Sequence, residues 1–232
     1  MGSLRWLSQA HRVDAFPPAH EALTEPNGLL AAGGDLKPER LLAAYSQGIF
    51  PWYQEGQPIL WWCPDPRAVL WPRALKVSRS LRRAVANRGF EFRVNTAFAD
   101  VVAACAQPRS YGAGTWITRE MAEAYVRLHE LGWAHSFETW HDGALAGGLY
   151  GVVLGRVFFG ESMFTRVTNA SKVALVHAVA FLTAQSIELI DCQVASAHTV
   201  SLGVVDLPRA QFLERIAALC RPPLSPRPWR LP

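Results

Sequence analysis

The sequence from residue 134 to residue 164 reads AHSFETWHDGALAGGLYGVVLGRVFFGESMF. It contains three apolar segments typical of strands, which we expect over residues 134–140, 145–153 and 157–164. Asp142-Gly143 between the first two is a strong hairpin signal, and Gly155-Arg156 supplies a second tight turn. The pattern therefore predicts an antiparallel meander of three strands.

The residues after the meander continue as helix, strand and helix. Apolar periodicity predicts a helix over 169–184, a strand buried on at least one face over 187–194, and a last helix after Pro208. This order indicates a layered fold of mixed class, α/β or α+β. It is also the order of the second half of acetyltransferase-like (GNAT) domains, which is an analogy of fold and not of function.

Three helices are expected between residue 78 and the meander. Ser78 can cap a helix that Gly89 ends, and residues 95–106 have the pattern of a mostly apolar helix. Thr118 caps a third helix, which Gly132 closes.

Turns and aromatic residues dominate the first third of the chain. A short helix is expected over 38–47, with Gly48 as its C-terminal stop. Pro64 and Pro66 follow an apolar run, so we interpret that run as an edge strand or a crossover and not as a central strand. We predict a small N-terminal domain over residues 1–66 and a larger domain over residues 67–232.

The composition is that of a soluble globular protein, since 50% of the 232 residues are hydrophobic and 18% are charged. The net charge of +4 permits an anionic partner such as RNA without indicating one. The four cysteines are far apart and form no cluster with metal-ligand spacing, so no metal site is expected. With no signal peptide or membrane span in sight, we expect a cytoplasmic protein. Its tail over 221–228 should be extended and free to move.

Polar side chains interrupt two of the apolar segments. Burying a lone carboxylate is costly, so Glu161 is either paired or faces a cavity, unless it lies on an exposed edge with a surface partner. Strand alternation places Asp191 and Gln193 on one face and Cys192 on the other. That pair fits a site at the end of the sheet, and the alternative is that Asp191 caps the next turn.

Positive charge gathers at two helices. Lys172 lies in the first turn of the helix after the meander, where it opposes the helix dipole. With the helix start it could hold an anion such as a phosphate, or its side chain could simply be solvated. Arg79, Arg82, Arg83 and Arg88 could follow a phosphate backbone, although a solvated helix face is the commoner origin of such a run.

The segment Arg109-Ser110-Tyr111-Gly112-Ala113-Gly114 matches the R-x-x-G-x-G pattern with which GNAT acetyltransferases bind the pyrophosphate of coenzyme A. In those enzymes the pattern lies between a strand and a helix start, where backbone amides face the phosphates. Here it follows an expected helix, and no glycine stands at the equivalent position after Phe164. We interpret the match as chance.

Short motifs occur in order along nearly the whole chain. They are EPNGLL (25–30), GGDL (33–36), GIFPW (48–52), WWCPDPR (61–67), GTWIT (114–118), YVRLH (125–129), GESMF (160–164), NASK (169–172), DCQ (191–193) and SLG (201–203). This ordered set resembles the bacterial leucyl/phenylalanyl-tRNA–protein transferase family. One short motif arises by chance, whereas an ordered set over most of a chain does not.

The resemblance implies a small N-terminal domain packed on a GNAT-like domain that uses neither coenzyme A nor any other cofactor nor a metal. The donor would be leucyl- or phenylalanyl-tRNA, with weak use of methionine. The acceptor would be the N-terminal α-amine of a protein that begins with Arg or Lys. The new first residue would mark the product for degradation as an N-degron, and we expect the enzyme to be a monomer.

The same resemblance implies roles for individual residues. An apolar pocket for the donor side chain would be lined by Trp52, Trp116, Phe158 and Met163. Glu161 would hold polar groups nearby, and Asp191 with Gln193 would serve the reacting amine. The tRNA acceptor stem would meet the helix with Arg79, Arg82 and Arg83, together with Lys172. Leu149, Ala178, Leu182 and Ser196 depart from the family pattern, which affects donor selectivity and not the class of reaction.

The expected reaction demands mainly positioning, because an aminoacyl ester is already activated. The α-amine has an ordinary pKa of about 8, so a modest interaction yields the nucleophile. We predict that Asp191 orients Gln193 and stabilises charge on the amine, while the Gln193 carbonyl accepts a hydrogen bond from it. One methylene changes binding by about 1–3 kcal/mol, so an apolar pocket should admit some methionine.

Two other functions are compatible with the sequence. One is a coenzyme A-dependent N-acetyltransferase, against which the missing pyrophosphate loop counts. The other is a non-catalytic tRNA-binding module.

Overall fold

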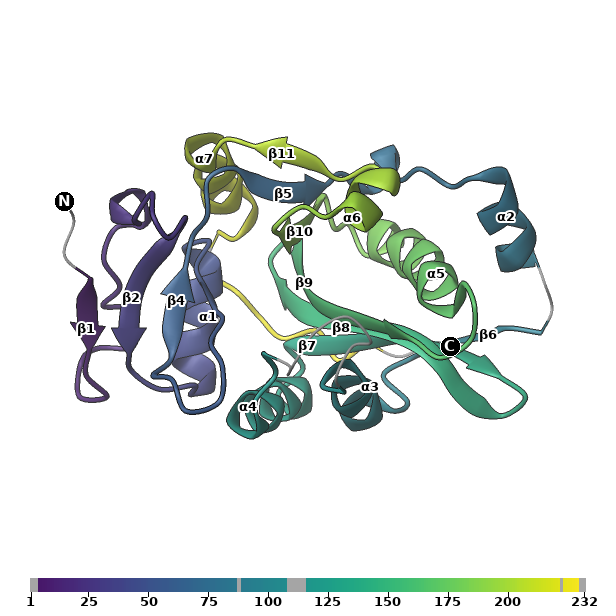
Figure 1. Cartoon of the computed structure of the whole chain (residues 1–232), viewed down its shortest axis with the longest axis horizontal. Helices are drawn as coiled ribbons and strands as arrows, with labels where there is room; N and C mark the ends of the chain where they lie inside the picture. Colours follow the sequence, from purple (N-terminus) through teal and green to yellow (C-terminus); the bar gives the residue numbers. More distant parts are fainter. Residues whose placement is uncertain (1–3, 87–88, 108–115, 222, 230–232) are drawn as a thin grey trace.

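The structure is a computed structural model that describes residues 4–86, 89–107, 116–221 and 223–229 (Figure 1). Within these residues the strands form a four-stranded sheet of order β1-β2-β4-β3 and a seven-stranded sheet of order β11-β5-β10-β9-β8-β7-β6. Short 3-10 turns lie at Ala19–Glu21 and Pro72–Ala74. The mixed class predicted from the sequence is confirmed.

The small sheet contains β1 (Arg5–Leu7), β2 (Leu29–Gly33), β3 (Phe50–Pro51) and β4 (Leu60–Trp62). Helix α1 (Pro38–Ser46) follows β2, and Gly48, with a φ of 73°, turns the chain after it as expected. β4 lies between β2 and β3, so the expectation of an edge strand is wrong. The prolines stand beyond Trp62, the last paired residue, and therefore remove no ladder hydrogen bond. Residues 63–66 then cross to the large sheet.

The predicted meander is present as β7 (Ala134–His141), β8 (Ala144–Leu154) and β9 (Val157–Thr165), all antiparallel. Asp142 and Gly143 have φ values of 50° and 75°, as a type I′ hairpin requires. An additional strand, β6 (Glu91–Val94), pairs with β7. Asn95 then turns the chain with a φ of 59°, so α3 (Phe98–Cys105) begins later than residue 95.

The other half of the large sheet is built on β10 (Leu189–Gln193), which lies parallel to β9 because α5 (Ala170–Ala184) crosses over between them. β5 (Arg67–Leu70) pairs with β10, and β11 (Val205–Leu207) pairs with β5, both antiparallel. The short α6 (Ala197–Ser201) precedes β11, and α7 (Arg209–Leu219) follows Pro208 as predicted.

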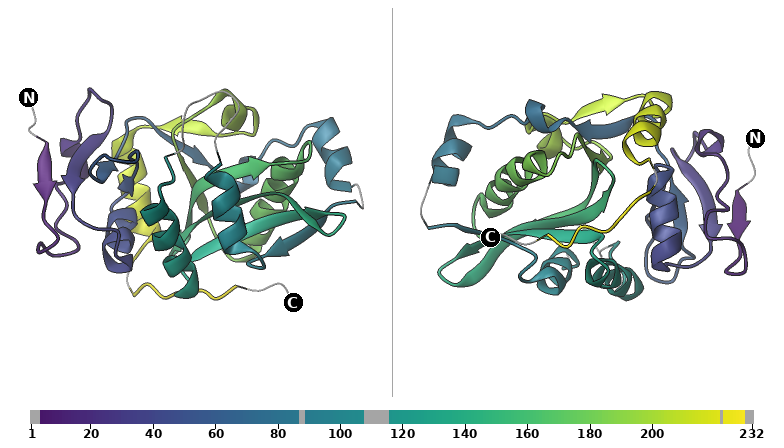
Figure 2. Two further views of the ribbon diagram at one scale, coloured as in Figure 1. Left: turned by 60° about the horizontal axis from the view of Figure 1, so that its bottom comes forward. Right: turned by 180° about the vertical axis from the view of Figure 1, so that it is seen from behind.

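Helices cover both faces of the large sheet (Figures 1 and 2). α5 packs Ala174, Ala178 and Leu182 against β-strand residues such as Phe137 and Phe158. α3 and α4 (Arg119–Glu130) pack on the opposite face. The Thr118 side chain caps α4 as predicted, accepting a hydrogen bond from the Met121 N–H. α2 (Arg79–Ala86) contacts α5 at the edge of the molecule.

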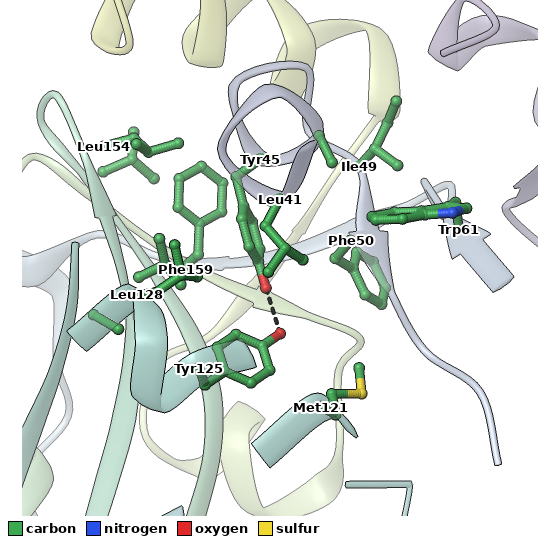
Figure 3. Packing of buried hydrophobic residues seen from close by; sticks show 14 of the residues in the cluster. Leu41, Tyr45, Ile49, Phe50, Trp61, Met121, Tyr125, Leu128, Leu154 and Phe159 are labelled. Atoms are coloured by element: carbon green, nitrogen blue, oxygen red, sulfur yellow. Dashed lines mark hydrogen bonds between the residues drawn. The ribbon is translucent and has the colours of Figure 1, made fainter. Parts of the chain in front are cut away.

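One apolar core joins the two sheets. Tyr45 of α1, Trp61 of β4, Met121 and Tyr125 of α4, and Phe159 of β9 are fully buried in it (Figure 3). The chain changes from one sheet to the other over residues 63–66, in line with a division at residue 66, which stays a prediction. The N-terminal part is therefore packed against the large sheet through side chains of both.

The segment after α7 is extended, as expected, but it is anchored (Figure 2). Trp229 is buried and packs its ring on His135, Phe137 and Phe181. Its carbonyl oxygen accepts a hydrogen bond of 2.8 Å from Asn95 Nδ2. Burial under this ring lowers the pKa of His135 to about 3. Trp229, directly after residues 221–228, thus fixes the end of this segment to the core, and the mobility of the segment stays a prediction.

Glu138 on β7 is a fully buried carboxylate at the start of α3. Its Oε1 accepts hydrogen bonds from the N–H groups of Thr96 and Ala97, each at 2.9 Å. Its Oε2 accepts hydrogen bonds from Thr96 Oγ1 and Trp140 Nε1. Since helix starts leave N–H groups without intrahelical partners, this carboxylate serves as a remote helix cap.

Glu138→Gln is expected to lower the free energy of unfolding by about 1–3 kcal/mol, because its NH₂ group would face buried donors. Urea unfolding followed by circular dichroism at pH 7 measures the difference. Glu91→Gln changes an exposed carboxylate that pairs with the partly buried Arg93, and this variant should unfold at the wild-type midpoint. An unchanged midpoint for Glu138→Gln would contradict the capping role.

Candidate active site

A cavity of about 1060 Å³ opens where two parallel strands separate. β9 and β10 pair only as far as Phe159 and Asp191. Beyond this point β9 stays with β8, whereas β10 ends at Gln193. Residues 160–166 and 192–194 line the cavity on its two sides. The ends of strands that diverge in this way are a common place for ligand sites in sheets with crossover helices.

Each of the two strands carries a β-bulge at the cavity. On β9 the register against β8 shifts between Gly160 and Ser162, which leaves Glu161 as the extra residue. On β10 the register against β5 shifts between Asp191 and Gln193. Bulges redirect side chains and are frequent next to active sites. They account for the position of both polar residues at the edge of the cavity.

The cavity has an apolar wall. Two of the predicted pocket residues, Phe158 and Met163, belong to it. Other apolar members include Leu70, Leu149, Leu175, Leu182 and Ile190. Leu149 and Leu182 are two of the positions at which the sequence departs from the family pattern. Such a wall favours an apolar, uncharged ligand group.

Trp52 and Trp116 do not line the cavity in the described part of the chain. Trp52 is 45% exposed and packs against Trp62, with ring centroids 5.6 Å apart. Trp116 packs on the core between the sheets. The structure therefore replaces the expected tryptophan lining with aliphatic side chains, and contact of the two tryptophans with a donor stays a prediction.

Glu161 and Gln193 lie together at the edge of the cavity and both line it. Gln193 Nε2 donates a hydrogen bond to Glu161 Oε1 at 3.3 Å. Gln193 has a φ of 55°, a left-handed conformation that residues other than glycine rarely adopt. Its backbone N–H donates to Asp191 Oδ1 at 3.0 Å, which helps to hold this conformation. The sequence-predicted pair is thus joined through the backbone.

Asp191 itself is fully buried and does not line the cavity. Its two oxygens accept hydrogen bonds from Arg67 Nε at 2.8 Å and Arg67 Nη2 at 2.6 Å. The structure does not support the expected contact between Asp191 and the reacting amine, because both carboxylate oxygens are bonded to Arg67 and are closed off from the cavity. In this structure Asp191 contacts Gln193 through the backbone N–H of Gln193.

Arg67 holds this buried ion pair between two aromatic rings. Its guanidinium carbon lies 4.7 Å from the ring centroid of Phe50 and 4.5 Å from that of Phe212. These contacts connect β5 and β10 with β3 of the small sheet and with α7. Sequence reasoning missed this residue, although it ends the motif over 61–67. The local sequence does not tell a buried arginine from a surface arginine. The partner that marks Arg67 as buried, Asp191, lies 124 residues away in the sequence.

Glu161 is also bonded on its other side by two tyrosines, Tyr45 and Tyr125, which the sequence patterns did not single out. Burial raises the pKa of Glu161 to about 7 by disfavouring the charged form. The hydrogen bonds from Tyr125 and Tyr45 lower this pKa, and the nearby charge of Asp191 raises it. A carboxyl group that titrates near neutrality at the edge of a cavity is a feature of active sites.

The positive side chains predicted to contact the tRNA lie on two helices that pack against each other, α2 and α5. Lys172 is half-buried and lines the cavity near the start of α5, which begins after Asn169. Arg79, Arg82 and Arg83 are exposed on α2, and α2 packs against α5. Arg88 and the segment from Arg109 to Gly114 lie outside the described residues.

No group of three or more His, Cys, Asp or Glu side chains is placed to hold a metal ion in the part of the chain that the structure describes. None of the described helices combines the length and apolar character that a membrane span requires. None of the four cysteines forms a disulfide in the described part of the chain.

Solved structures with a similar arrangement are remote in sequence. A functionally unknown conserved protein from Staphylococcus epidermidis matches with a TM-score of 0.44 and 10% identity, over 78% of this chain and 68% of the other. A GCN5-related N-acetyltransferase from Kribbella flavida matches with a TM-score of 0.37 and 13% identity, over 73% and 60%.

Comparison of sequences gives a much stronger result. The family model described as leucyl/phenylalanyl-tRNA protein transferase matches residues 69–217, and the model of its N-terminal domain matches residues 34–65. A leucyl/phenylalanyl-tRNA–protein transferase from Aromatoleum aromaticum is 58% identical over 97% of this chain and 93% of its own length. One from Stutzerimonas stutzeri is 56% identical over 98% and 99%. The resemblance found in the motifs is confirmed, and the chain belongs to the leucyl/phenylalanyl-tRNA–protein transferase family.

Proposed function

We propose that this enzyme transfers leucine or phenylalanine, and methionine weakly, from aminoacyl-tRNA to the N-terminal α-amine of proteins that begin with Arg or Lys. Identity of more than half to transferases of that name, over nearly the whole chain, supports the donor and the reaction. The structural observation that carries the proposal is the apolar cavity that opens beside the Glu161–Gln193 pair.

The apolar wall provides the donor site. Full burial of a leucine or phenylalanine side chain contributes about 1.5–3 kcal/mol, whereas a charged side chain would lose its hydration there. Because aliphatic groups such as Leu149 and Leu182 form much of the wall, its shape can adapt to flat and branched side chains. Methionine is flexible and apolar, so it should enter with a small loss of affinity.

The chemical step is aminolysis of an ester. The acceptor amine attacks the carbonyl carbon, a C–N bond forms, and the bond between this carbon and the ribose oxygen breaks. The amine loses a proton and the ribose oxygen gains one. The Gln193 carbonyl can accept a hydrogen bond from the amine, but an amide is no base at neutral pH. Since Asp191 is enclosed by Arg67, water or the substrate itself takes the proton.

The arginines of α2 are the proposed contact with the tRNA acceptor stem, together with Lys172 at the cavity. The three arginines are exposed, and α2 packs on the helix whose start carries Lys172. Phosphate contacts of this kind release counterions, so binding should weaken as salt increases.

Replacing Arg79, Arg82 and Arg83 together with alanine is expected to reduce the slope of log binding constant against log salt concentration by about 2–3. Titration of the protein into labelled leucyl-tRNA at several salt concentrations measures this slope. Arg119 and Arg127 on α4 are exposed on the opposite face of the sheet, and their double alanine variant is the matched control. A slope that responds equally to both variants would place the tRNA elsewhere.

The remaining parts of the proposal concern the cell. The new leucine or phenylalanine would mark the product for degradation as an N-degron, and the reaction would take place in the cytoplasm. The lack of a disulfide among the four cysteines, all of which lie in the described residues, is in keeping with a reducing compartment.

A direct assay tests the function. The protein is mixed with radiolabelled leucyl-tRNA or phenylalanyl-tRNA and a peptide that begins with Arg, beside the same peptide with a blocked amine. We expect label on the free peptide only. Acetyl-CoA replaces the charged tRNA in a second arm. Acetylation there, without transfer from tRNA, would overturn the proposal in favour of an acetyltransferase.

A further inference from the structure

Three oxygen-bearing groups close a ring behind the cavity. The Tyr45 hydroxyl oxygen lies 2.7 Å from Glu161 Oε1, and the Tyr125 hydroxyl oxygen lies 2.5 Å from Glu161 Oε2. The two hydroxyl oxygens also lie 2.6 Å apart, and Figure 3 shows them facing each other from α1 and α4. Both tyrosines are fully buried. The ring joins both sheets to the edge of the cavity.

The number of protons in this ring indicates whether Glu161 is ionised or neutral. Each of the three short contacts requires one proton between its two oxygens, but the two hydroxyl groups supply only two. With an ionised Glu161, one contact would bring two lone pairs together inside a medium of low dielectric constant, which is costly. A neutral Glu161 supplies the third proton. Oε2–H then donates to Tyr125, Tyr125 donates to Tyr45, and Tyr45 donates to Oε1.

We infer that Glu161 works as a neutral carboxylic acid held in a three-proton ring with Tyr45 and Tyr125, and that this ring positions the Gln193 amide. The inference rests on the proposed function for its role in transfer. In the closed ring the carboxyl proton is engaged with a tyrosine oxygen, so Glu161 Oε1 can only accept a hydrogen bond from Gln193, whichever way round the ring the hydroxyl groups donate. Gln193 must therefore turn its NH₂ group to Glu161, at 3.3 Å, and its carbonyl oxygen is left for the cavity.

A neutral Glu161 also benefits the acceptor amine. A negative charge at the edge of the cavity would stabilise the ammonium form and raise the pKa of the amine, and an ammonium group is no nucleophile. A neutral ring removes this charge while it keeps Glu161 as a hydrogen-bond acceptor. Gln193 can then offer its carbonyl to an amine that loses its proton readily. Glu161 and the two tyrosines are thus positioning residues and act through Gln193.

The surroundings of Glu161 agree with this state. Burial raises its pKa to about 7, so the ring keeps its third proton in most molecules at pH 6. The ionisable groups that influence Glu161 from the neighbouring elements are Tyr45 on α1, Tyr125 on α4, Tyr150 on β8, Asp191 on β10 and Arg67 on β5. The tyrosine pKa values are raised well above 10, so these hydroxyls stay protonated, and Asp191 and Arg67 offset each other as an ion pair.

The protonation state can be tested without any substrate. Folding raises the pKa of Glu161 from 4.5 to about 7, so its contribution to stability is complete below pH 4.5 and is lost as the pH rises through 7. We therefore compare the free energy of unfolding of the wild type with that of Glu161→Gln. The difference, wild type minus variant, should decrease as the pH rises from 4.5 to about 7 and stay constant at higher pH. The carbonyl stretch of a protonated carboxyl group should appear in the infrared spectrum of the wild type at pH 6 and be missing in the variant. An ionised Glu161 at pH 6 overturns the inference.

The role in positioning needs kinetics. Glu161→Gln copies the neutral acid and should lower kcat/KM for the Arg peptide by about three- to tenfold at pH 7. Glu161→Leu releases Gln193 and should lower it by about 100-fold. Above pH 7 the wild type should lose activity relative to Glu161→Gln, because only the wild type becomes charged. Equal loss in the two variants, or parallel pH profiles for wild type and Glu161→Gln, overturns the inference.

The tyrosines give a readout that a purely structural role would not move. Removing either hydroxyl opens the ring and removes the contact that an ionised Glu161 would leave without a proton, so Tyr45→Phe and Tyr125→Phe should each lower the Glu161 midpoint. A raised midpoint would instead mean that each tyrosine merely donates to an ionised carboxylate, and it would overturn the ring. An unmoved midpoint in both folded variants overturns the ring. Should the wild type transfer no amino acid at all, the proposed function fails, while the titration of Glu161 still decides whether the ring exists.

Discussion

Arg67→Met is expected to lower the free energy of unfolding by about 3–5 kcal/mol, because it leaves a fully buried carboxylate without its partner. Both oxygens of Asp191 are bonded to Arg67, and neither side chain is exposed. The methionine would keep some contact with Phe50 and Phe212 but could not balance the charge. The penalty is therefore electrostatic, and it should exceed that of a similar change at the surface.

Denaturant unfolding of Arg67→Met measures the loss, with Arg156→Met as the control. Arg156 pairs with Glu188, but both side chains are about half exposed, so this variant should differ from the wild type by less than about 1 kcal/mol. The double variant Arg67→Met, Asp191→Leu removes both charges and should recover most of the stability. A double variant as unstable as the single one would mean that packing around Arg67, and not the lone charge, sets the loss.

Gln193→Asn is expected to lower kcat/KM for transfer by about 10- to 100-fold, since a hydrogen bond to a charged or developing-charge group contributes about 1.5–3 kcal/mol. Asparagine tolerates the left-handed conformation that Gln193 adopts, so the backbone should stay in place. The side chain, however, is shorter by one methylene, and its carbonyl no longer reaches the amine. The loss should appear in kcat, while the Kd of the aminoacyl-tRNA changes little.

The same substitution at Gln57, in an exposed turn, provides the control and should leave transfer unchanged. Unfolding midpoints of both variants show whether the fold is intact. If the stable Gln193→Asn protein transferred at the wild-type rate, the amide carbonyl would have no part in binding the amine.

Local signals in the sequence predicted much of the second half of the fold. The meander, the cap of α4 at Thr118 and the helix after Asn169 each depend on neighbours within a few residues, and all are present. The strands β5, β6 and β11 were not predicted. Each has only three or four residues, and its strand character comes from partners far along the chain. Short pairings of this kind leave no period in the sequence.

The site divides in the same way. Glu161 and Gln193 stood out because polar groups interrupted apolar strands, and the structure brings them together. Tyr45 and Tyr125 did not, since a tyrosine at helical spacing has the same pattern whether it fills a core or binds a carboxyl group. Trp52 was expected in the cavity from the resemblance alone, and its exposed position depends on a contact with Trp62 that no spacing predicts.

The position of Tyr45 has a consequence for anyone who would divide this protein. Helix α1 belongs to the small sheet, yet it supplies one of the two hydroxyls that Glu161 requires. A fragment starting at residue 67 would keep the residues that line the cavity but lose the Tyr45 hydroxyl. The pKa of Glu161 in such a fragment should therefore differ from that in the whole protein. Any change in the packing of α1 against α4 would likewise change the proton affinity of Glu161, because Tyr45 and Tyr125 meet at this contact. The packing of the N-terminal part against the large sheet therefore also determines the pKa of Glu161.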